Sequence, residues 1–236
     1  MKKPAFSAVL LGIILLLLVS CRSTDNVETF TKEQYDYALH LVLNQAQEKA
    51  TSDLFKQFNE FNEPMIPDDY SDIEERRSEI PGMDLLIRQW SEAATLFILQ
   101  IYGSFTDYVE ILRGQISFRN PKALLEAGDD SISALYSSLY LDDIANMIAQ
   151  YIHGMDFTPW RTMLIQYNAW ASTRNRLYNE DTELLNADMQ SEELIRLFSY
   201  HLASLFFEHL AASEVLIRTT PDLSMDPVEA RVLDLI

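Results

Sequence analysis

The sequence predicts an all-α protein, an irregular multi-helix bundle that follows an N-terminal export signal. Apolar residues recur at steps of three or four through most of the 236 residues, which is the spacing of one helix face. No segment alternates with period two between turn signals, as a half-buried strand would. Prolines, glycines and small polar residues stand where the periodic stretches begin and end, so they divide the chain into helices.

The first twenty residues have the pattern of an export signal. Lys2 and Lys3 make the start basic, residues 5–19 carry no charge, and a small serine precedes Cys21. The uncharged run is shorter than the roughly 20 residues that a membrane-spanning helix needs, and it has the length of a signal-peptide core. We therefore expect residues 1–20 to be removed as a signal peptide.

The residues around the expected cleavage point are Leu18-Val19-Ser20-Cys21. They resemble the lipobox of bacterial lipoproteins, in which the cysteine receives a diacylglyceryl group, the chain is cut before it, and the new amino group is acylated, for example with palmitate. Such chemistry needs a thiol as its nucleophile, and Cys21 is the only cysteine, so no intramolecular disulfide competes for it. The resemblance implies lipidation at Cys21. An ordinary secretory signal or an uncleaved anchor is the alternative.

Residues 21–30 are expected to be a lipidated tether between the membrane and the fold. Fully extended, residues 22–30 reach at most about 30 Å, so the domain would stay near its membrane. The resemblance implies a location in the cell envelope. The periplasmic face of the outer membrane is favoured over the inner membrane or the cell surface, because Arg22 is not the aspartate that retains lipoproteins at the inner membrane in some bacteria.

The charge of the chain restricts its partners. Removal of residues 1–20 takes away two lysines and no acidic residue. The remaining chain then has 16 basic and 36 acidic residues, a net charge of −20. Such a surface repels phosphate backbones and anionic lipid head groups, and we therefore expect no nucleic-acid partner. The charge favours solubility, and a hydrophobic content of 48% suffices for one domain with a packed core.

The first expected helix covers residues 32–62. Thr31 and Gln34 resemble a capping box, and the apolar residues that follow recur at steps of three or four. The next two prolines end the helix. The strongly charged residues 63–82 are expected to form a connector outside the core, with one short exposed helix.

Residues 84–113 are apolar on more than one side, which is typical of a helix at the centre of a bundle or in a membrane. Glu92, Gln100 and Asp107 interrupt this apolar surface too often for a membrane span. We therefore expect the segment to be the buried central helix.

Shorter helices are expected next. One covers residues 122–127, a second opens at Ser131, and a third covers residues 141–153. Gly128 is expected to end the first of them, and an aspartate of the pair Asp129-Asp130 is expected to cap the second.

Two longer helices complete the chain. Thr158 is expected to be an N-cap with Pro159 at the first helical position. After the polar residues 179–190, Ser191 opens the last helix. These elements together predict a single helical domain at residues 31–236.

Four stretches of the chain follow one another in a recognisable order. They are an Ala-rich helix, an Ile-Pro turn, a turn like Gly-Gly-Asp, and a last helix followed by Ile-Arg and proline. They are residues 46–50, Ile66-Pro67, residues 124–130, and residues 202–221 with Glu214 and Ile217-Arg218. Together they resemble an uncharacterised exported family, domain of unknown function 4197. The resemblance implies a helical exported fold and no established activity.

No catalytic constellation is visible. The six glycines are far apart, so the chain has no phosphate-binding loop and no nucleophile elbow. His201 and His209 are eight residues apart, about 80° around a helix, unlike the three- or four-residue spacing of helical metal ligands. The pairs Asp129-Asp130 and Asp142-Asp143 lack the pattern of a calcium loop. We expect no enzymatic activity, no metal and no cofactor, and Cys21 is the only candidate site residue.

The aromatic residues leave two functions open. They recur along two of the expected helices, at Trp160, Tyr167, Trp170 and Tyr178 and at Phe198, Phe206 and Phe207. Rings at such spacing usually fill a core, which favours a protein-interaction or structural module at the membrane. Rings that line a cavity would instead indicate a carrier or sensor of an apolar ligand such as a lipid. The expected partners are the membrane, through the lipid on Cys21, and either another envelope protein or an apolar ligand.

Overall fold

The computed structural model describes residues 30–60 and 64–220. Within these residues it contains seven α-helices, one short 3-10 helix and no strand, which confirms the predicted all-α bundle. The α-helices are α2 (Lys32–Asn59), α3 (Asp72–Glu75), α4 (Met83–Gln115), α5 (Pro121–Glu126), α6 (Ser131–Ile152), α7 (Thr158–Tyr178) and α8 (Ser191–Thr219). The expected signal peptide, Cys21 and residues 22–29 of the tether lie outside the described residues. None of the described helices is long and apolar enough to cross a membrane.

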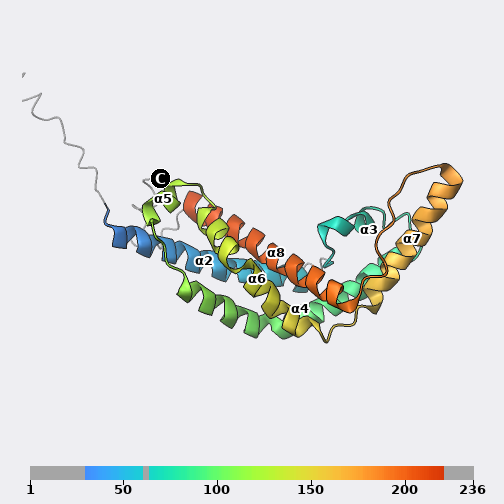
Figure 1. Cartoon of the computed structure of the whole chain (residues 1–236), viewed down its shortest axis with the longest axis horizontal. Coiled ribbons are helices and arrows are strands. Elements are labelled where there is room, and N and C mark those ends of the chain that lie inside the picture. The colour runs from blue at the N-terminus through green and yellow to red at the C-terminus, as the bar shows by residue number, and fades with distance from the viewer. Residues whose placement is uncertain (1–29, 61–63, 221–236) are drawn as a thin grey trace, which may run out of the picture. The chain divides into compact units, whose positions relative to one another are not determined.

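Helix α8 has the most extensive packing, against α2 and α6, and α4 packs against both of these helices (Figure 1). The buried row of α2 includes Ala38, Ala46 and Ala50, whose small side chains allow close approach of a neighbouring helix. α2 begins at Lys32, as predicted, but it ends at Asn59, before the expected residue 62. In a longer helix the ring of Pro64 would clash with the carbonyl group four residues earlier.

The connector between α2 and α4 belongs partly to the core, which corrects the expectation that it lies outside. Its apolar side chains at Met65, Ile66, Ile73 and Ile80 are buried. Trp90 Nε1 of α4 donates a hydrogen bond of 2.7 Å to the carbonyl oxygen of Met65. In place of one short helix, the connector contains the 3-10 helix η1 (Asp68–Tyr70) and α3. Four apolar side chains are enough to anchor it, although charges dominate its sequence.

Helix α4 is one uninterrupted helix, as predicted, but it is not buried on all sides. Leu96 and Leu99 are 70% and 47% exposed. The helices that pack most extensively against α4 are α2, α6 and α7. Together with rings of α8 that contact Trp90 and Phe105, they cover only the face that carries these two residues. The expectation of a fully surrounded central helix is therefore wrong, and α4 presents several large apolar side chains to solvent.

Helix α6 is continuous from Ser131 to Ile152, where two helices opening at Ser131 and residue 141 were expected. No proline or glycine interrupts the chain there, so nothing breaks the helix. α7 contains Thr158 as its first residue, and the N-cap is Phe157. Asp156 accepts a hydrogen bond of 2.9 Å from the Thr158 N–H, so its carboxylate satisfies the helix start in place of the expected Thr158 cap.

The polar residues 179–190, which we call the strap, connect α7 to α8. Asn168 donates to the carbonyl of Leu185 and accepts from its N–H, at 2.7 and 2.8 Å. Asn175 makes the same two bonds with Thr182, each of 2.9 Å. The two asparagines are two helical turns apart, about 10.5 Å, and three extended residues also span about 10 Å. The strap is therefore held antiparallel to α7 by its backbone.

Candidate functional site

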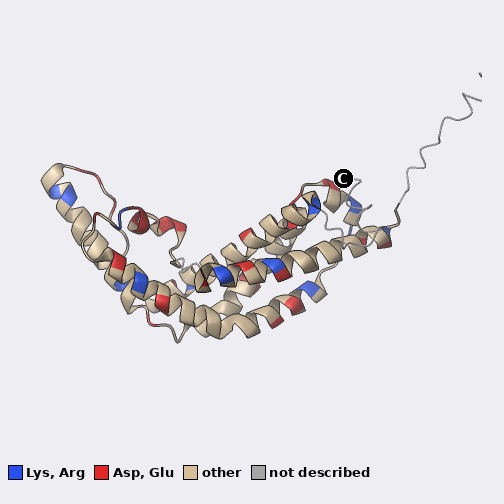
Figure 2. Ribbon diagram, turned by 180° about the vertical axis from the view of Figure 1, so that it is seen from behind, with Lys and Arg blue, Asp and Glu red and all other residues tan. Residues whose placement is uncertain are grey.

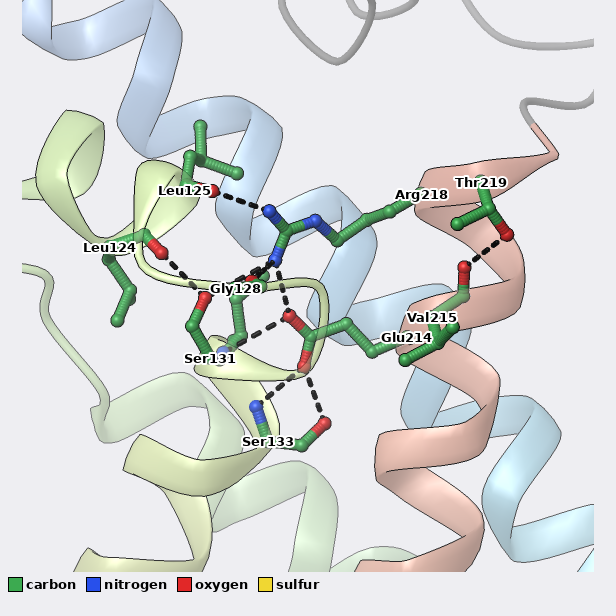
Figure 3. A network of polar contacts seen from close by, with 10 residues as sticks. Leu124, Leu125, Gly128, Ser131, Ser133, Glu214, Val215, Arg218 and Thr219 are labelled. Atoms are coloured by element: carbon green, nitrogen blue, oxygen red, sulfur yellow. Dashed lines mark hydrogen bonds and ion pairs between the residues drawn. The ribbon is translucent and has the colours of Figure 1, made fainter. Parts of the chain in front are cut away.

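A buried ion pair joins two stretches that carry the family resemblance. Glu214 and Arg218 lie one turn apart on α8, with the side chains only 1% and 4% exposed, and Arg218 Nη1 is 3.1 Å from Glu214 Oε1. Both side chains meet the turn between α5 and α6 (Figure 3). The fold thus places the last helix of the resemblance against residues 124–130.

The Glu214 carboxylate caps α6 from another helix. It accepts hydrogen bonds from the N–H groups of Ile132 and Ser133, at 3.1 and 2.7 Å, and from Ser133 Oγ at 2.6 Å. Both N–H groups lie in the first helical turn, where no backbone acceptor exists. Asp130 stands at the N-cap, but its side chain makes no capping bond, so the expectation that an aspartate caps this helix is wrong. Glu214 replaces it because its carboxylate reaches the same N–H groups from α8.

Arg218 satisfies the other side of the turn. Its guanidinium donates to the carbonyl oxygens of Leu125 and Gly128, and to Ser131 Oγ at 3.2 Å. Burial raises the pKa of Glu214, while the hydrogen bonds from Ser133, Ile132 and Arg218 act against that increase. Because these charged atoms are paired within a buried cluster, the network fixes α5, α6 and α8 in one geometry.

An open groove of about 670 Å³ runs along a different face of α8. The α8 residues that line it recur at steps of one, three or four, which places them on one face of the helix. They are Glu193, Arg196, Leu197, Tyr200, His201, Ser204, Leu205 and Glu208. Pro67, Asp68 and Asp69 of the connector and Asn186 and Met189 of the strap complete the lining. We call this hollow the α8 groove.

The α8 groove is acidic. Its lining contains the carboxylates of Asp68, Asp69, Glu193 and Glu208 and the single guanidinium of Arg196. With a neutral histidine, the net charge of the lining is −3. No described lysine or arginine forms an ion pair with Asp68, Asp69 or Glu208. Figure 2 shows acidic residues gathered on the short segment around α3, and Asp68 and Asp69 of that segment line the groove. Leu197, Leu205 and Met189 add an apolar component between these charges.

His201 is the histidine that lines the α8 groove. Burial lowers its pKa below the ordinary value of 6.5, and the nearby Asp68 acts in the opposite direction. Its neighbour Tyr200 donates a hydrogen bond of 2.8 Å to Asp142 of α6. That bond is the main cause that raises the pKa of Tyr200. At neutral pH the groove therefore contains a neutral imidazole and a protonated phenol.

The histidines are not brought together. His40 lies 4.8 Å from the ring of Phe118, His209 Nε2 lies 2.7 Å from Gln57 Oε1, and His153 is exposed at the end of α6. Among residues 30–60 and 64–220, no group of three or more His, Cys, Asp or Glu side chains is placed to hold a metal ion.

Five of the seven aromatic side chains considered above are buried in the core, namely Trp160, Tyr167, Phe198, Phe206 and Phe207. Trp90 lies 4.8 Å from Phe198 and 5.5 Å from Trp160, measured between ring centroids, and all three are fully buried. Phe105 and Phe206 are in contact at 5.2 Å further along α8. Among the rings considered as lining a cavity, only Tyr178 is largely exposed, at 65%. This arrangement corresponds to the expectation that the rings fill a helical core.

Comparisons with protein-family models, with curated proteins and with solved structures give no match. The resemblance to domain of unknown function 4197 therefore stays a prediction. Lipidation of Cys21 also stays a prediction, because that residue lies outside the described part of the chain.

The α8 groove cannot be read from the sequence alone. Leu197, His201 and Leu205 stand at helical spacing in the last helix, and the structure leaves them half-buried in the groove. A signal was present, because these residues flank the buried row that contains Phe198 and Phe206 and make the apolar stripe wider than one helix contact needs. The connector wall was not visible in the sequence, since its approach to α8 depends on the tertiary fold.

Proposed function

We propose that this chain is a membrane-anchored lipoprotein of the bacterial cell envelope whose helical domain binds another protein. The observation that carries the binding part is the open, acidic and partly apolar α8 groove beside a core that is filled with aromatic rings. Protein surfaces that bind partners combine an apolar centre with a polar rim. The anchoring part rests on the lipobox residues that end at Cys21.

The alternative is a carrier or sensor of an apolar ligand. Sites for such ligands are mostly apolar and enclose most of the ligand surface. The α8 groove is open and contains four carboxylates, which favours a protein partner over a lipid. Absence of an enzymatic activity is part of the same proposal.

Photo-crosslinking in intact cells tests the binding function. A photoreactive residue at Ser204, inside the groove, should give a discrete adduct with another protein, whereas the same residue at the exposed Ser172 on α7 should not. Native mass spectrometry of the extracted chain provides the opposing outcome. A lipid bound to the folded domain in stoichiometric amount, with no adduct at Ser204, would favour the carrier instead.

Cys21→Ser tests the anchor independently. We expect the variant to lose lipid labelling and lipoprotein-type cleavage, because serine lacks the thiolate that accepts the lipid. A variant that is still labelled with palmitate would contradict the proposal for Cys21 and leave the binding function untouched.

A further inference from the structure

The α8 groove has the dimensions of a helix-binding site. Its α8 lining extends from Glu193 to Glu208, fifteen residue steps along the helix, or about 22 Å along the axis. Leu197 and Leu205 are eight residues apart on that face, with His201 between them. A partner helix that lies along α8 would need apolar side chains one and two turns apart to contact this row.

The charges around that apolar row select the partner. Asp68 and Asp69 lie on the connector, and Glu193 and Glu208 stand at the two ends of the α8 lining. With Arg196 as the single compensating cation, the groove presents a net charge of −3 to whatever enters it. Complementary potentials steer association and exclude wrong partners.

From this geometry we infer that the α8 groove binds a basic amphipathic helix of another protein. The partner helix contributes an apolar stripe toward Leu197 and Leu205 and lysine or arginine side chains toward the connector and the two ends of the groove. This inference rests on the proposed binding function and specifies the chemistry of the partner.

The same charges disfavour the other candidate occupants. A second copy of the chain would place its own groove, also with a net charge of −3, against the first groove, and the two would repel each other. Residues 221–236 of the chain contain four acids, Asp222, Asp226, Glu229 and Asp234, against one base, Arg231, so their balance of −3 is unfavourable as well. Anionic lipid and nucleic acid are repelled for the same reason.

The test measures binding of two synthetic peptides to the full chain. Each peptide has about 15 residues with leucines at every third or fourth position, and the remaining positions are lysine in one peptide and glutamate in the other. We expect the lysine peptide to bind with one peptide per chain and the glutamate peptide not to bind.

Charge-reversal variants locate the binding site. Asp69→Lys together with Glu208→Lys changes the groove, and the matched pair Asp107→Lys with Glu110→Lys makes the same change in net charge on the exposed face of α4. The groove variant should lose at least about tenfold in affinity for the lysine peptide, and the control should lose less than about twofold. Leu205→Ser should also weaken binding. Equal losses in the two charge-reversal variants would show nonspecific attraction and would overturn the inference.

Two further outcomes would assign the groove to another occupant. If the lysine peptide binds only after deletion of residues 221–236, the chain's own C-terminal segment fills the groove. If Asp69→Lys with Glu208→Lys abolishes a dimer of the chain, a second copy fills it. In either case the inference is wrong. A protein adduct at Ser204 in cells, formed by an acidic segment of the partner, would also overturn it while leaving the proposed binding function intact.

Discussion

The two halves of α8 are held in place by different physical means. Near its C-terminal end, Glu214 and Arg218 are buried charges whose hydrogen bonds go to named atoms of the α5–α6 turn. Near its N-terminal end, Phe198 packs among the rings of Trp90 and Trp160, with few directional bonds. A charged contact of this kind is stable only when every partner is present, whereas ring packing loses stability in proportion to the atoms removed. In the C-terminal half of α8, buried charges therefore fix the geometry of the packing. In the N-terminal half, the burial of aromatic rings provides most of the stability.

Glu214→Ala should produce the largest loss of stability. It leaves the Arg218 guanidinium buried without its carboxylate and removes the cap of α6, so we expect the free energy of unfolding to fall by about 3–5 kcal/mol. Urea denaturation measures this change. The double variant Glu214→Leu with Arg218→Met should recover much of the loss, since no charge is then left buried. If the double variant is as unstable as Glu214→Ala, the loss does not come from an unpaired buried charge, and the proposed difference between the two halves of α8 is wrong.

A matched tryptophan pair tests the aromatic half. Trp90→Phe and Trp160→Phe remove the same atoms from fully buried positions. Trp90 Nε1 donates to Met65, whereas Trp160 Nε1 has no hydrogen-bond partner among the described residues. We expect Trp90→Phe to cost about 1–3 kcal/mol more than Trp160→Phe, because it leaves the Met65 carbonyl unsatisfied. Thermal and urea unfolding measure the difference, and equal costs would show that the rings alone determine stability here.

Asn168→Ala and Asn175→Ala address the polar edge of the aromatic half. Each removes two hydrogen bonds to one strap residue, and we expect a loss of about 1 kcal/mol or less in global stability, since the strap is mostly exposed. Hydrogen exchange should accelerate at Leu185 in the first variant and at Thr182 in the second. Asn44→Ala on α2, which removes an exposed bond to Glu48, is the control and should leave exchange in the strap unchanged. Exchange in the strap that does not respond would contradict its attachment by backbone bonds.

His201 should produce the smallest effect, as a dependence of stability on pH. Because burial lowers its pKa in the folded chain below the ordinary 6.5, the unfolded chain takes up the proton first as the pH falls. Stability should therefore decrease below a pH of about 6.5, and Asp68 reduces the size of this effect. His201→Gln should flatten the profile between pH 5 and 7, measured by urea denaturation, with His153→Gln as the exposed control. A profile unchanged by His201→Gln would show that its imidazole remains solvated.

Helix periodicity predicted the bundle because the buried rows follow it closely. Caps and breaks were predicted less well, since they depend on contacts from distant residues. Glu214 and Arg218 have the spacing of an ordinary surface ion pair on a helix, and only the approach of the α5–α6 turn buries them. In the same way, the leucine content of α4 is typical of a core helix. Leu96 and Leu99 are nevertheless exposed, because no helix among the described residues covers them. The α8 groove could not be predicted, because one of its walls is the connector and the position of the connector depends on the tertiary fold.

The bonds between the strap and α7 have a consequence for the history of the sequence. The hydrogen bonds of Asn168 and Asn175 go to the peptide groups of Leu185 and Thr182, so they constrain the number of residues between these two positions and not their side chains. Substitutions at the exposed Asp181, Glu183 and Leu184 should cost little stability, whereas a single inserted residue between Thr182 and Leu185 shifts one peptide group out of reach. This segment can therefore diverge in composition among descendants of the chain while its length stays constant.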